Sequence, residues 1–349
     1  MEVAATNKTL EHISQVFGVS AMTVSNALNG RKGVSEKKAH AIRQYAVKVG
    51  YQPDYRASSL TRRRTRMIGV CLRATPTVPW WAQLVYEVQK LLYASDFRMT
   101  LGIAPEGPKQ ENSFLDHFMA LRCEAVLVGP LGYAYQYKAL AHRLSGIPYA
   151  IGFETFSDLP IDSVSIDEFA GMQLAVRHLY EQGHRDIGHF GVPDEVFGKS
   201  ELRTRHNGYL SQMKQLDLSI CEQWIISEAS GKMALESLLQ SGEPLPTAWC
   251  THDDNAATRL IRVLDEMGYS VPGDMSVMGF DNLNIASLIH PQLTTIGFDV
   301  HRHARAIVDQ LLENVERIRN EQKRTEPVAS ILTPPLLIQR SSVAQIKEA

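Results

Sequence analysis

The chain has 349 residues, a length that predicts two or three domains. Its fractions of apolar and charged residues, 44% and 21%, are those of an ordinary globular protein. No apolar run reaches the roughly 18 residues of a membrane-spanning helix, and the polar N-terminus does not resemble a secretory signal, so we expect a cytoplasmic protein. The four cysteines show no CxxC spacing, which indicates neither a zinc knuckle nor a disulfide framework.

Charge is distributed unevenly along the chain. The formal net charge is −2, but residues 1–66 hold 12 Lys and Arg against 4 Asp and Glu, a net of +8, which leaves −10 for the remainder. A basic end on an acidic body is typical of a protein that binds nucleic acid through that end. The alternative is a basic, solvated tail, and the sequence inside this segment argues against it.

Two short amphipathic segments near the N-terminus predict a helix-turn-helix. The first spans 9–17, with Thr9 as its cap and Gly18 at its end, and the second spans 21–28, with Ser20 as its cap. Two short helices joined by a turn that contains glycine form this motif. A helical bundle that binds a protein is the alternative interpretation.

A third segment, 35–49, is predicted to close a small core with Ala39, Ile42, Tyr45, Ala46 and Val49. Val24 and Leu28 are expected to face the first helix. The second helix then turns outward a face of small and polar side chains, namely Ala21, Met22, Thr23, Ser25 and Asn26. Such a face suits a helix that enters the major groove of DNA.

Residues 51–66 follow the helices and contain several arginines. Residues 54–60 could form one or two helical turns, which are too short to be stable alone and would fold only against a partner. Ala57 is small enough for two such helices to approach closely, and Leu60 could wedge between base steps of the minor groove. An unstructured basic linker is the alternative.

The rest of the chain alternates short β-type runs with helical periods. Strands are predicted at 67–72, 98–104, 125–129, 149–153, 163–166, 186–191, 247–251, 276–280 and 293–298. Helices are predicted at 81–94, 110–121, 168–182, 201–215, 231–239, 255–267 and 300–318. This alternation favours an α/β fold with parallel sheets, whose ligands bind at the carboxyl ends of the strands.

These motifs, in this order, resemble the lactose/galactose-repressor family of bacterial transcription regulators. The matching strings are GVSAMTVSNALNG (18–30), VSE (34–36), GYQP (50–53), ASSL (57–60), RTRMIGV (64–70), GHRDIGHFG (183–191), HDDNAA (252–257), VPGDMSVMGFDN (271–282) and PQLTTI (291–296). The resemblance implies an effector-controlled, dimeric DNA-binding protein whose body is two-lobed, like a periplasmic sugar-binding protein.

The resemblance also implies the domain boundaries. Residues 1–66 would be the three-helix DNA-binding domain with its hinge helix at 53–62, and residues 67–345 the effector-binding and dimerisation domain. Three crossovers would join an N-terminal lobe of about 67–167 and 297–332 to a C-terminal lobe of about 168–296 and 333–345.

Roles of single residues follow from the matched motifs. Major-groove reading falls to Ala21, Met22 and Asn26, and contacts to the DNA backbone fall to Ser20, Thr23, Ser25 and Asn29. Leu60 matches the minor-groove lever, and Tyr51 and Ala57 complete the predicted DNA-binding set. The side chain of Asn26 can pair with the N6 and N7 atoms of adenine.

The predicted effector site lies in the cleft between the lobes. Arg205 and Asp281 match residues that bind the effector, and the indole rings of Trp80 and Trp81 match an aromatic pair that stacks on it. The remaining members are Phe153, Lys199, Glu201, His252 and Phe298. This set favours a sugar or a sugar acid as the effector.

No enzymatic or metal-binding motif accompanies these features. The sequence contains no GxxxxGK[ST], GxSxG or HExxH string, and the spacing of His301 and His303 does not converge on a metal. We therefore expect no cofactor and no catalytic activity. The body alone would also suit a sugar-binding module, but the helix-turn-helix and hinge favour a regulator. We expect a repressor of a sugar or sugar-acid operon that binds a pseudo-palindromic operator as a homodimer, with no membrane partner.

Overall fold

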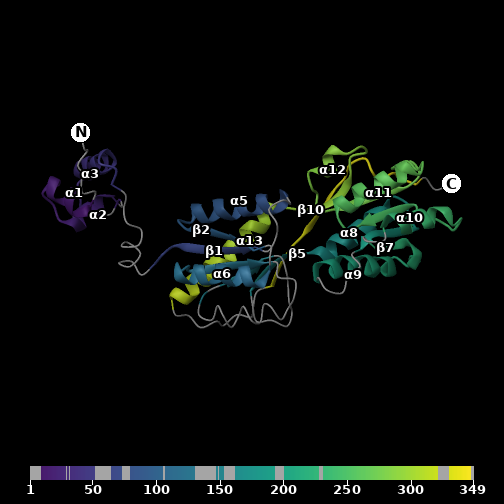
Figure 1. Ribbon diagram of the computed structural model, residues 1–349, viewed down its shortest axis with the longest axis horizontal. Coiled ribbons are helices and arrows are strands. Elements are labelled where there is room, and N and C mark those ends of the chain that lie inside the picture. The colour runs from purple at the N-terminus through teal and green to yellow at the C-terminus, as the bar shows by residue number, and fades with distance from the viewer. Residues whose placement is uncertain are drawn as a thin grey trace. The chain divides into compact units, whose positions relative to one another are not determined.

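The computed structural model describes residues 9–28, 30, 32–51, 64–72, 79–104, 107–129, 147, 149–152, 162–192, 200–227, 231–320 and 330–346. The predicted hinge and five predicted site residues lie outside this part of the chain, namely 53–62, Asn29, Ala57, Leu60, Phe153 and Lys199. The chain divides into two compact units, residues 1–65 and 66–349 (Figure 1).

The first unit contains the predicted helix-turn-helix. Its helices are α1 (Leu10–Phe17), α2 (Ala21–Leu28) and α3 (Glu36–Lys48). The Thr9 side chain accepts a hydrogen bond from the backbone N–H of His12 and so caps α1. Gly18 ends that helix in the left-handed conformation, at φ 56°. Both predicted helix boundaries are therefore confirmed.

Small and branched side chains fill the core of this unit. Its buried members are Ile13, Val24, Ala27, Ala39, Ile42 and Ala46. Leu28 and Tyr45 pack against them, as predicted, but Val49 is wrongly placed by the sequence reasoning. Val49 follows the last turn of α3 as its C-cap residue, where the chain leaves the helix, and its side chain is partly exposed.

The second unit is built on two sheets, as the α/β prediction requires. Within the described residues, the first sheet has the strand order β11-β5-β4-β3-β1-β2, and all its pairs are parallel. Its strands are β1 (Met67–Leu72), β2 (Arg98–Ile103), β3 (Ala125–Gly129), β4 (Tyr149–Gly152), β5 (Ser163–Ile166) and β11 (Ser330–Thr333). Its helices are α5 (Pro79–Ala94), α6 (Pro108–Ala120) and α13 (Val300–Arg319).

The second sheet repeats this arrangement with the order β12-β10-β9-β8-β6-β7. Its strands are β6 (Ile187–Val192), β7 (Ile225–Ser227), β8 (Ala248–Thr251), β9 (Ser276–Phe280), β10 (Thr294–Phe298) and β12 (Pro335–Ile338). The accompanying helices are α8 (Glu168–Glu181), α9 (Ser200–Gln215), η1 (Glu222–Trp224), α10 (Gly231–Gln240), α11 (Asp254–Glu266) and α12 (Ile285–Leu288). The edge strand β12 runs antiparallel to β10, while the other described pairs of this sheet are parallel, as predicted.

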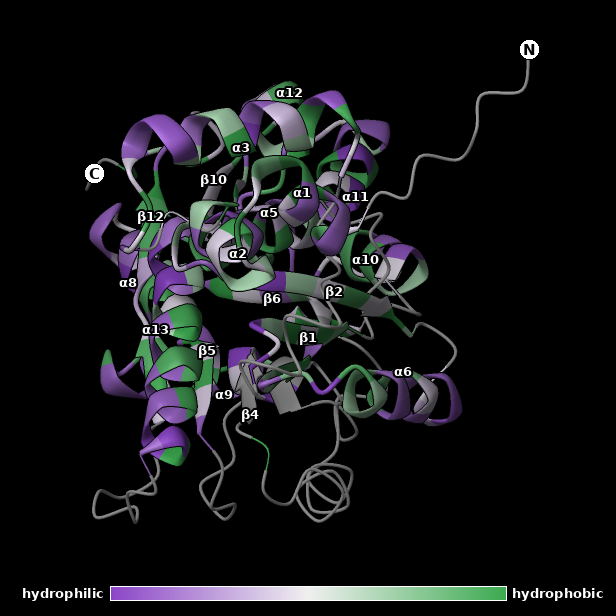
Figure 2. Ribbon diagram, turned by 90° about the vertical axis from the view of Figure 1, so that its left-hand side faces the viewer, coloured by the Kyte–Doolittle hydropathy of each residue, from purple (hydrophilic) through white to green (hydrophobic). Residues whose placement is uncertain are grey.

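Apolar side chains on alternate strand positions pack under the helices of both sheets. In the first sheet, α5 and α13 cover one face and α6 covers the other. In the second, α8 and α9 cover one face while α10 and α11 cover the other. Figure 2 shows apolar and polar residues alternating along α13, whose apolar side is buried against the sheet. Among the described helices, none is both long and apolar enough to cross a bilayer.

The chain passes between the sheets within short segments. β5 of the first sheet ends at Ile166, and α8, which packs on the second sheet, begins at Glu168. β10 of the second sheet is followed by α13 of the first, and β11 is followed by β12. Each sheet reverses its strand order beside its first strand, β1 or β6, and open α/β sheets bind ligands at the carboxyl ends of strands at such points.

Candidate nucleic-acid interface and effector site

The N-terminus of α2 is capped by Ser20, as predicted. Its hydroxyl oxygen accepts a hydrogen bond from the backbone N–H of Thr23 at 3.1 Å and lies 2.9 Å from the Thr23 hydroxyl. Capping satisfies one of the backbone donors that the first turn of a helix leaves without a partner. The same turn carries the predicted DNA-reading residues.

The faces of α2 divide as the sequence predicts. Val24 and Ala27 are buried in the three-helix core, whereas the Met22 side chain is 66% exposed. Ser25 and Asn26 are partly exposed on the same helix. The helix therefore presents an amide and hydroxyl groups, which can hydrogen-bond base edges and phosphates, beside the apolar side chain of Met22.

A contact from α3 holds α2 in position. Arg43 on α3 donates a hydrogen bond from Nη1 to the carbonyl of Ala27 at 3.1 Å, and its Nη2 pairs with Glu36 at 2.5 Å. The last turn of α2 is thus held from α3 while its first turn stays open. Tyr51, predicted to contact DNA, packs at least partly against the core of this unit.

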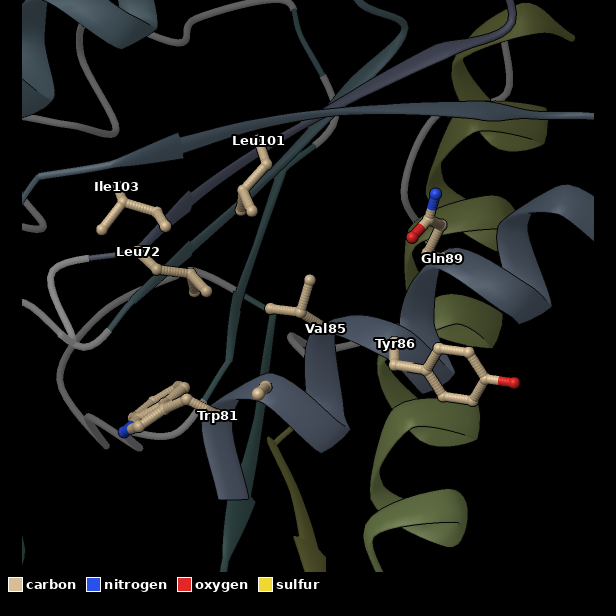
Figure 3. Close-up of a pocket in the computed structure, with 8 residues that line it drawn as sticks. Leu72, Trp81, Val85, Tyr86, Gln89, Leu101 and Ile103 are labelled. Atoms are coloured by element: carbon tan, nitrogen blue, oxygen red, sulfur yellow. The ribbon is translucent and has the colours of Figure 1, made fainter. Parts of the chain in front are cut away.

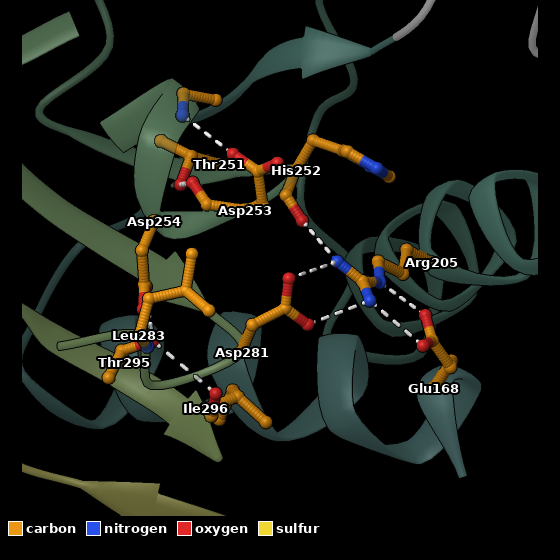
Figure 4. Close-up of polar contacts among 11 residues, drawn as sticks. Glu168, Arg205, Thr251, His252, Asp253, Asp254, Asp281, Leu283, Thr295 and Ile296 are labelled. Carbon is orange, nitrogen blue, oxygen red and sulfur yellow. Dashed lines mark hydrogen bonds and ion pairs between the residues drawn. The ribbon is translucent and has the colours of Figure 1, made fainter. Parts of the chain in front are cut away.

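Arg205 on α9 is the centre of a polar cluster in the lobe built on the second sheet (Figure 4). Its Nε and Nη2 donate to the two carboxylate oxygens of Glu168, and Nη2 also donates to Asp281 Oδ1 at 2.9 Å. Its Nη1 donates to the carbonyl of His252 at 2.8 Å and lies 3.4 Å from Asp281 Oδ2. The structure therefore brings together three of the predicted effector residues and adds Glu168.

The cluster is buried, and its charges depend on one another. The Arg205 side chain is 9% exposed, that of Glu168 14% and that of Asp281 29%. Burial alone lowers the pKa of Arg205, but the charges of Asp281 and Glu168 outweigh that effect and raise it above its ordinary value. Burial raises the pKa of Asp281, although the neighbouring guanidinium opposes that shift.

Asp281 follows the carboxyl end of β9 in an unusual backbone conformation. Its φ is +94°, a region that side chains other than glycine rarely adopt, and its N–H donates to the carbonyl of Ile296 at 2.7 Å. Strained residues of this kind gather at binding sites, where the surrounding structure holds them in place. The strain is consistent with a binding role for this carboxylate.

Asp253 and Asp254 support the same strand ends. Asp253 caps α11 by accepting from the N–H of Ala256. Buried Asp254 accepts from Leu283 N–H at 2.5 Å and from the Thr295 hydroxyl at 2.6 Å. Burial raises the pKa of Asp254 to about 7, although the Thr295 hydrogen bond opposes the shift. These contacts are structural, and no cluster of metal-ligating side chains occurs among the described residues.

The indole rings of Trp80 and Trp81 lie at the start of α5, beside the first sheet. Their ring centroids are 5.0 Å apart in an edge-on arrangement, and Trp80 also lies 6.0 Å from the ring of His303. Trp81 lines a cavity of about 320 Å³ between α5 and the strands β1 and β2 (Figure 3). Among the described residues, the cavity lining is mostly apolar and contains no other predicted effector residue.

The structure places two of the remaining predicted effector residues, Phe298 and His252, at strand ends. Phe298 ends β10, and its ring lies 5.7 Å from that of Phe280. His252 is buried at the end of β8 and contributes its carbonyl to Arg205. Glu201 lies in the first turn of α9, but its side chain is outside the described part of the chain.

Sequence reasoning missed Glu168 and Phe280, both of which contact Arg205. The guanidinium carbon lies 4.0 Å from the centroid of the Phe280 ring, a cation–π contact. Glu168 begins α8, where an acidic residue is already explained by the helix dipole. It lies 37 positions from Arg205, so no local pattern in the sequence signals the contact.

A second cluster of side chains joins helix α9 to strand β6. The Nδ1 atoms of His189 on β6 and His206 on α9 are 3.1 Å apart, and their rings stack. Tyr209 packs on both rings and donates its hydroxyl to the carbonyl of Ile187 at 2.7 Å. Burial lowers the pKa of His189 to about 3, and the charges of His206 and Arg205 act in the same direction.

Comparisons with known proteins agree with this organisation. Residues 9–54 match the family described as "Bacterial regulatory proteins, lacI family", and residues 176–343 match the "Periplasmic binding protein-like domain". The "HTH-type transcriptional repressor PurR" of Actinobacillus pleuropneumoniae serotype 3 (strain JL03) is 30% identical over 337 residues, which cover 95% of this chain and 98% of that relative.

Two solved structures share the fold. A crystal structure of the lac repressor dimer bound to operator and the anti-inducer ONPF superposes with a TM-score of 0.81 at 21% identity, covering 96% of this chain and 99% of that one. A complex of the transcriptional regulator CelR with cellobiose superposes with a TM-score of 0.67 at 24% identity, with the same coverage of both chains. At these identities the likeness establishes the fold alone.

Proposed function

Because the chain belongs to the lacI family of bacterial regulatory proteins, we propose that it represses transcription from a pseudo-palindromic operator under the control of a small effector. The observation that carries the proposal is the capped, outward-facing helix α2, with exposed Met22 and partly exposed Asn26 at its surface. A helix of this kind reads base edges in the major groove. The protein would act in the cytoplasm, where its operator is found.

The operator would be bound by a homodimer. A single helix-turn-helix reads only a half-site, so a two-fold symmetric pair of chains matches a pseudo-palindromic operator. The predicted hinge segment supports the same arrangement, because so short a helix needs a second copy or DNA to fold against. One solved structure that superposes over most of this chain is described as a lac repressor dimer bound to operator.

The effector would bind at the carboxyl ends of the strands, beside the cluster of Arg205 and Asp281. A sugar suits this place because carboxylates accept hydrogen bonds from hydroxyl groups and indole rings present an apolar face to a sugar ring. The structural relative in complex with cellobiose is consistent with a sugar. A sugar or sugar-acid utilisation operon is then the expected target.

A purine base is the second candidate for the effector. The flat indoles of Trp80 and Trp81 suit a heterocyclic ring as well as a sugar, and the curated relative at 30% identity is a repressor named PurR. Both candidates present hydrogen-bond donors to the carboxylates. They differ in the shape that the lobes must enclose.

Binding-site selection with the full-length protein tests the DNA-binding function. Random duplexes retained by the protein should converge on a sequence with two-fold symmetry. The selected duplex should bind with an affinity that changes when the effector is added, because a ligand shifts affinity only by binding the two states unequally. Retention of duplexes without any shared sequence would contradict the proposal.

A further inference from the structure

The guanidinium of Arg205 has no donor left for a ligand in the observed arrangement. An arginine side chain carries five N–H groups. Glu168 takes two of them, the carbonyl of His252 takes one, and Asp281 is within 2.9 and 3.4 Å of the other two. A ligand that enters beside Arg205 therefore meets a side chain that is already saturated.

The ring of Phe280 closes one face of the same side chain. The guanidinium carbon lies 4.0 Å from the ring centroid, and the Arg205 side chain is only 9% exposed. The Asp281 side chain, at 29%, is the most exposed member of the cluster. Within this cluster of described residues, solvent and ligands therefore reach mainly the Asp281 carboxylate.

The described charges around the cluster are predominantly negative. Two carboxylates, Glu168 and Asp281, surround a single guanidinium, so one negative charge of the cluster has no positive partner within it. A carboxylate or phosphate group on a ligand offers only acceptors and adds a further negative charge. A hydroxyl, amine or ring N–H offers the donor that a carboxylate accepts.

We propose that the effector is a neutral or cationic molecule rich in hydrogen-bond donors, and that Glu168 sets this preference by keeping Arg205 closed to anions. The inference rests on the proposed effector function and narrows it. Neutral sugars, amino sugars and neutral purine bases fit, whereas sugar acids and sugar phosphates do not. Glu168 is thus a specificity-determining residue that acts through Arg205.

Matched ligand pairs test the charge preference directly. Thermal shift and calorimetry on the full-length protein would compare galactose with galacturonate, glucose with glucuronate, ribose with ribose 5-phosphate, and inosine with inosine monophosphate. We expect that whichever series binds, its neutral member binds at least about ten-fold tighter than its anionic member. An acid or phosphate that binds tightest in its series overturns the inference.

Inorganic phosphate gives a test that does not depend on knowing the effector. Glu168→Gln removes one carboxylate and frees donors of Arg205, so it should create a saturable stabilisation by phosphate. Wild type and Glu181→Gln, which removes an exposed acid from the same helix α8, should show only the gradual effect of added salt. If Glu168→Gln does not fold, Asp281→Asn tests the same point from the other carboxylate.

The outcomes of the phosphate titration are distinct from those of the proposed function. Saturable phosphate binding by wild type would contradict the inference that Arg205 is closed to anions. The absence of saturable phosphate binding in both Glu168→Gln and Asp281→Asn would contradict it as well. If an anionic ligand alters operator affinity, the proposed function as a regulator stands, and only the inference that the effector is neutral or cationic is wrong. If the protein selects no symmetric duplex, the proposed function as a regulator is wrong. The phosphate titration then still tests whether Glu168 closes Arg205 to anions.

Discussion

At the scale of single residues, the buried ionisable side chains of the second unit depend on charges supplied from other elements. Arg205 is held by two carboxylates, one from α8 and one from the end of β9, so its single positive charge is shared between acceptors on different elements. His189 shows the opposite case, a titratable group that is kept neutral because burial and positive neighbours disfavour its charged form.

The titration of His189 predicts how stability depends on pH. Its pKa is lowered from 6.5 to about 3 in the folded protein. Between these values the unfolded chain binds a proton that the folded chain does not. The free energy of unfolding therefore falls as pH drops below about 6.5, by up to about 1.4 kcal/mol per pH unit from this group.

Denaturant unfolding between pH 4 and 8 measures this dependence. His189→Gln should flatten the slope below pH 6.5, while His290→Gln, a change at an exposed histidine, should leave it unaltered. Other buried histidines also contribute to the slope, so the comparison between variants isolates one proton. Equal slopes in wild type and His189→Gln would contradict the burial argument.

Asn26 is predicted to determine base preference. Replacing it with alanine should cost about 1–3 kcal/mol on the selected operator and relax the preference at one base pair of each half-site, because the side-chain amide can pair bidentately with adenine. Gln44→Ala, at an exposed position of α3, is the control. Binding-site selection that returns the same preferences for Asn26→Ala would reject this assignment.

At the scale of elements, the close approach of α8 and α9 places Glu168 against Arg205. Gly208 of α9 makes this approach possible, since a Cβ there would lie 2.5 Å from the carbonyl oxygen of Phe169 and 3.1 Å from Met172 Cβ. The first of these atoms is backbone and can move only with its helix. The pairing of the two side chains therefore depends on a residue that contacts neither.

Gly208→Ala should separate the two helices. We expect a loss of about 1–3 kcal/mol in the free energy of unfolding, as for other overpacked contacts. Saturable binding of phosphate should appear as well, because Glu168 no longer occupies the donors of Arg205 once the two move apart. Lys214→Ala, on the exposed side of α9, should change neither quantity. Unaltered stability in Gly208→Ala would show that the helices can shift without cost.

At the scale of the whole molecule, the two units divide the proposed regulation between them. Residues 1–65 carry helix α2, which we propose reads DNA, and residues 66–349 carry the Arg205 cluster, beside which we propose that the effector binds. An effector can alter operator affinity only if it binds two arrangements of the protein unequally, and the coupling must then act in both directions. Variants in one unit should separate the two binding events.

Leu60→Ala and Asp281→Asn should have opposite effects. Loss of the leucine wedge should weaken operator binding and leave effector binding intact, whereas loss of the carboxylate should weaken the effector and leave operator binding in its absence nearly unchanged. Calorimetry of each variant, with and without operator, measures both affinities. Operator binding by Leu60→Ala as tight as that of wild type would mean that the helix-turn-helix acts alone.

Local patterns in the sequence determined most elements of the fold. Thr9, Gly18 and Ser20 mark helix boundaries through hydrogen bonds and a backbone conformation that involve only near neighbours, so they could be recognised without the structure. The strands β1, β3, β5 and β9 begin and end where the apolar runs do. The strands β7, β11 and β12 were missed. All three lie at a sheet edge and are only partly buried, so the apolar run that marks a central strand is weak in them.

Only the tertiary structure decided which residues form the polar cluster around Arg205. Arg205 and Asp281 were predicted, but their direct pairing and the closure of Arg205 by Glu168 were not. These contacts join α8, α9 and the end of β9. Along the chain, Glu168 lies 37 residues from Arg205 and Asp281 lies 76 residues from it. Side-chain periodicity reports which face of an element is buried, but the identity of the partner across such separations depends on how the elements pack together.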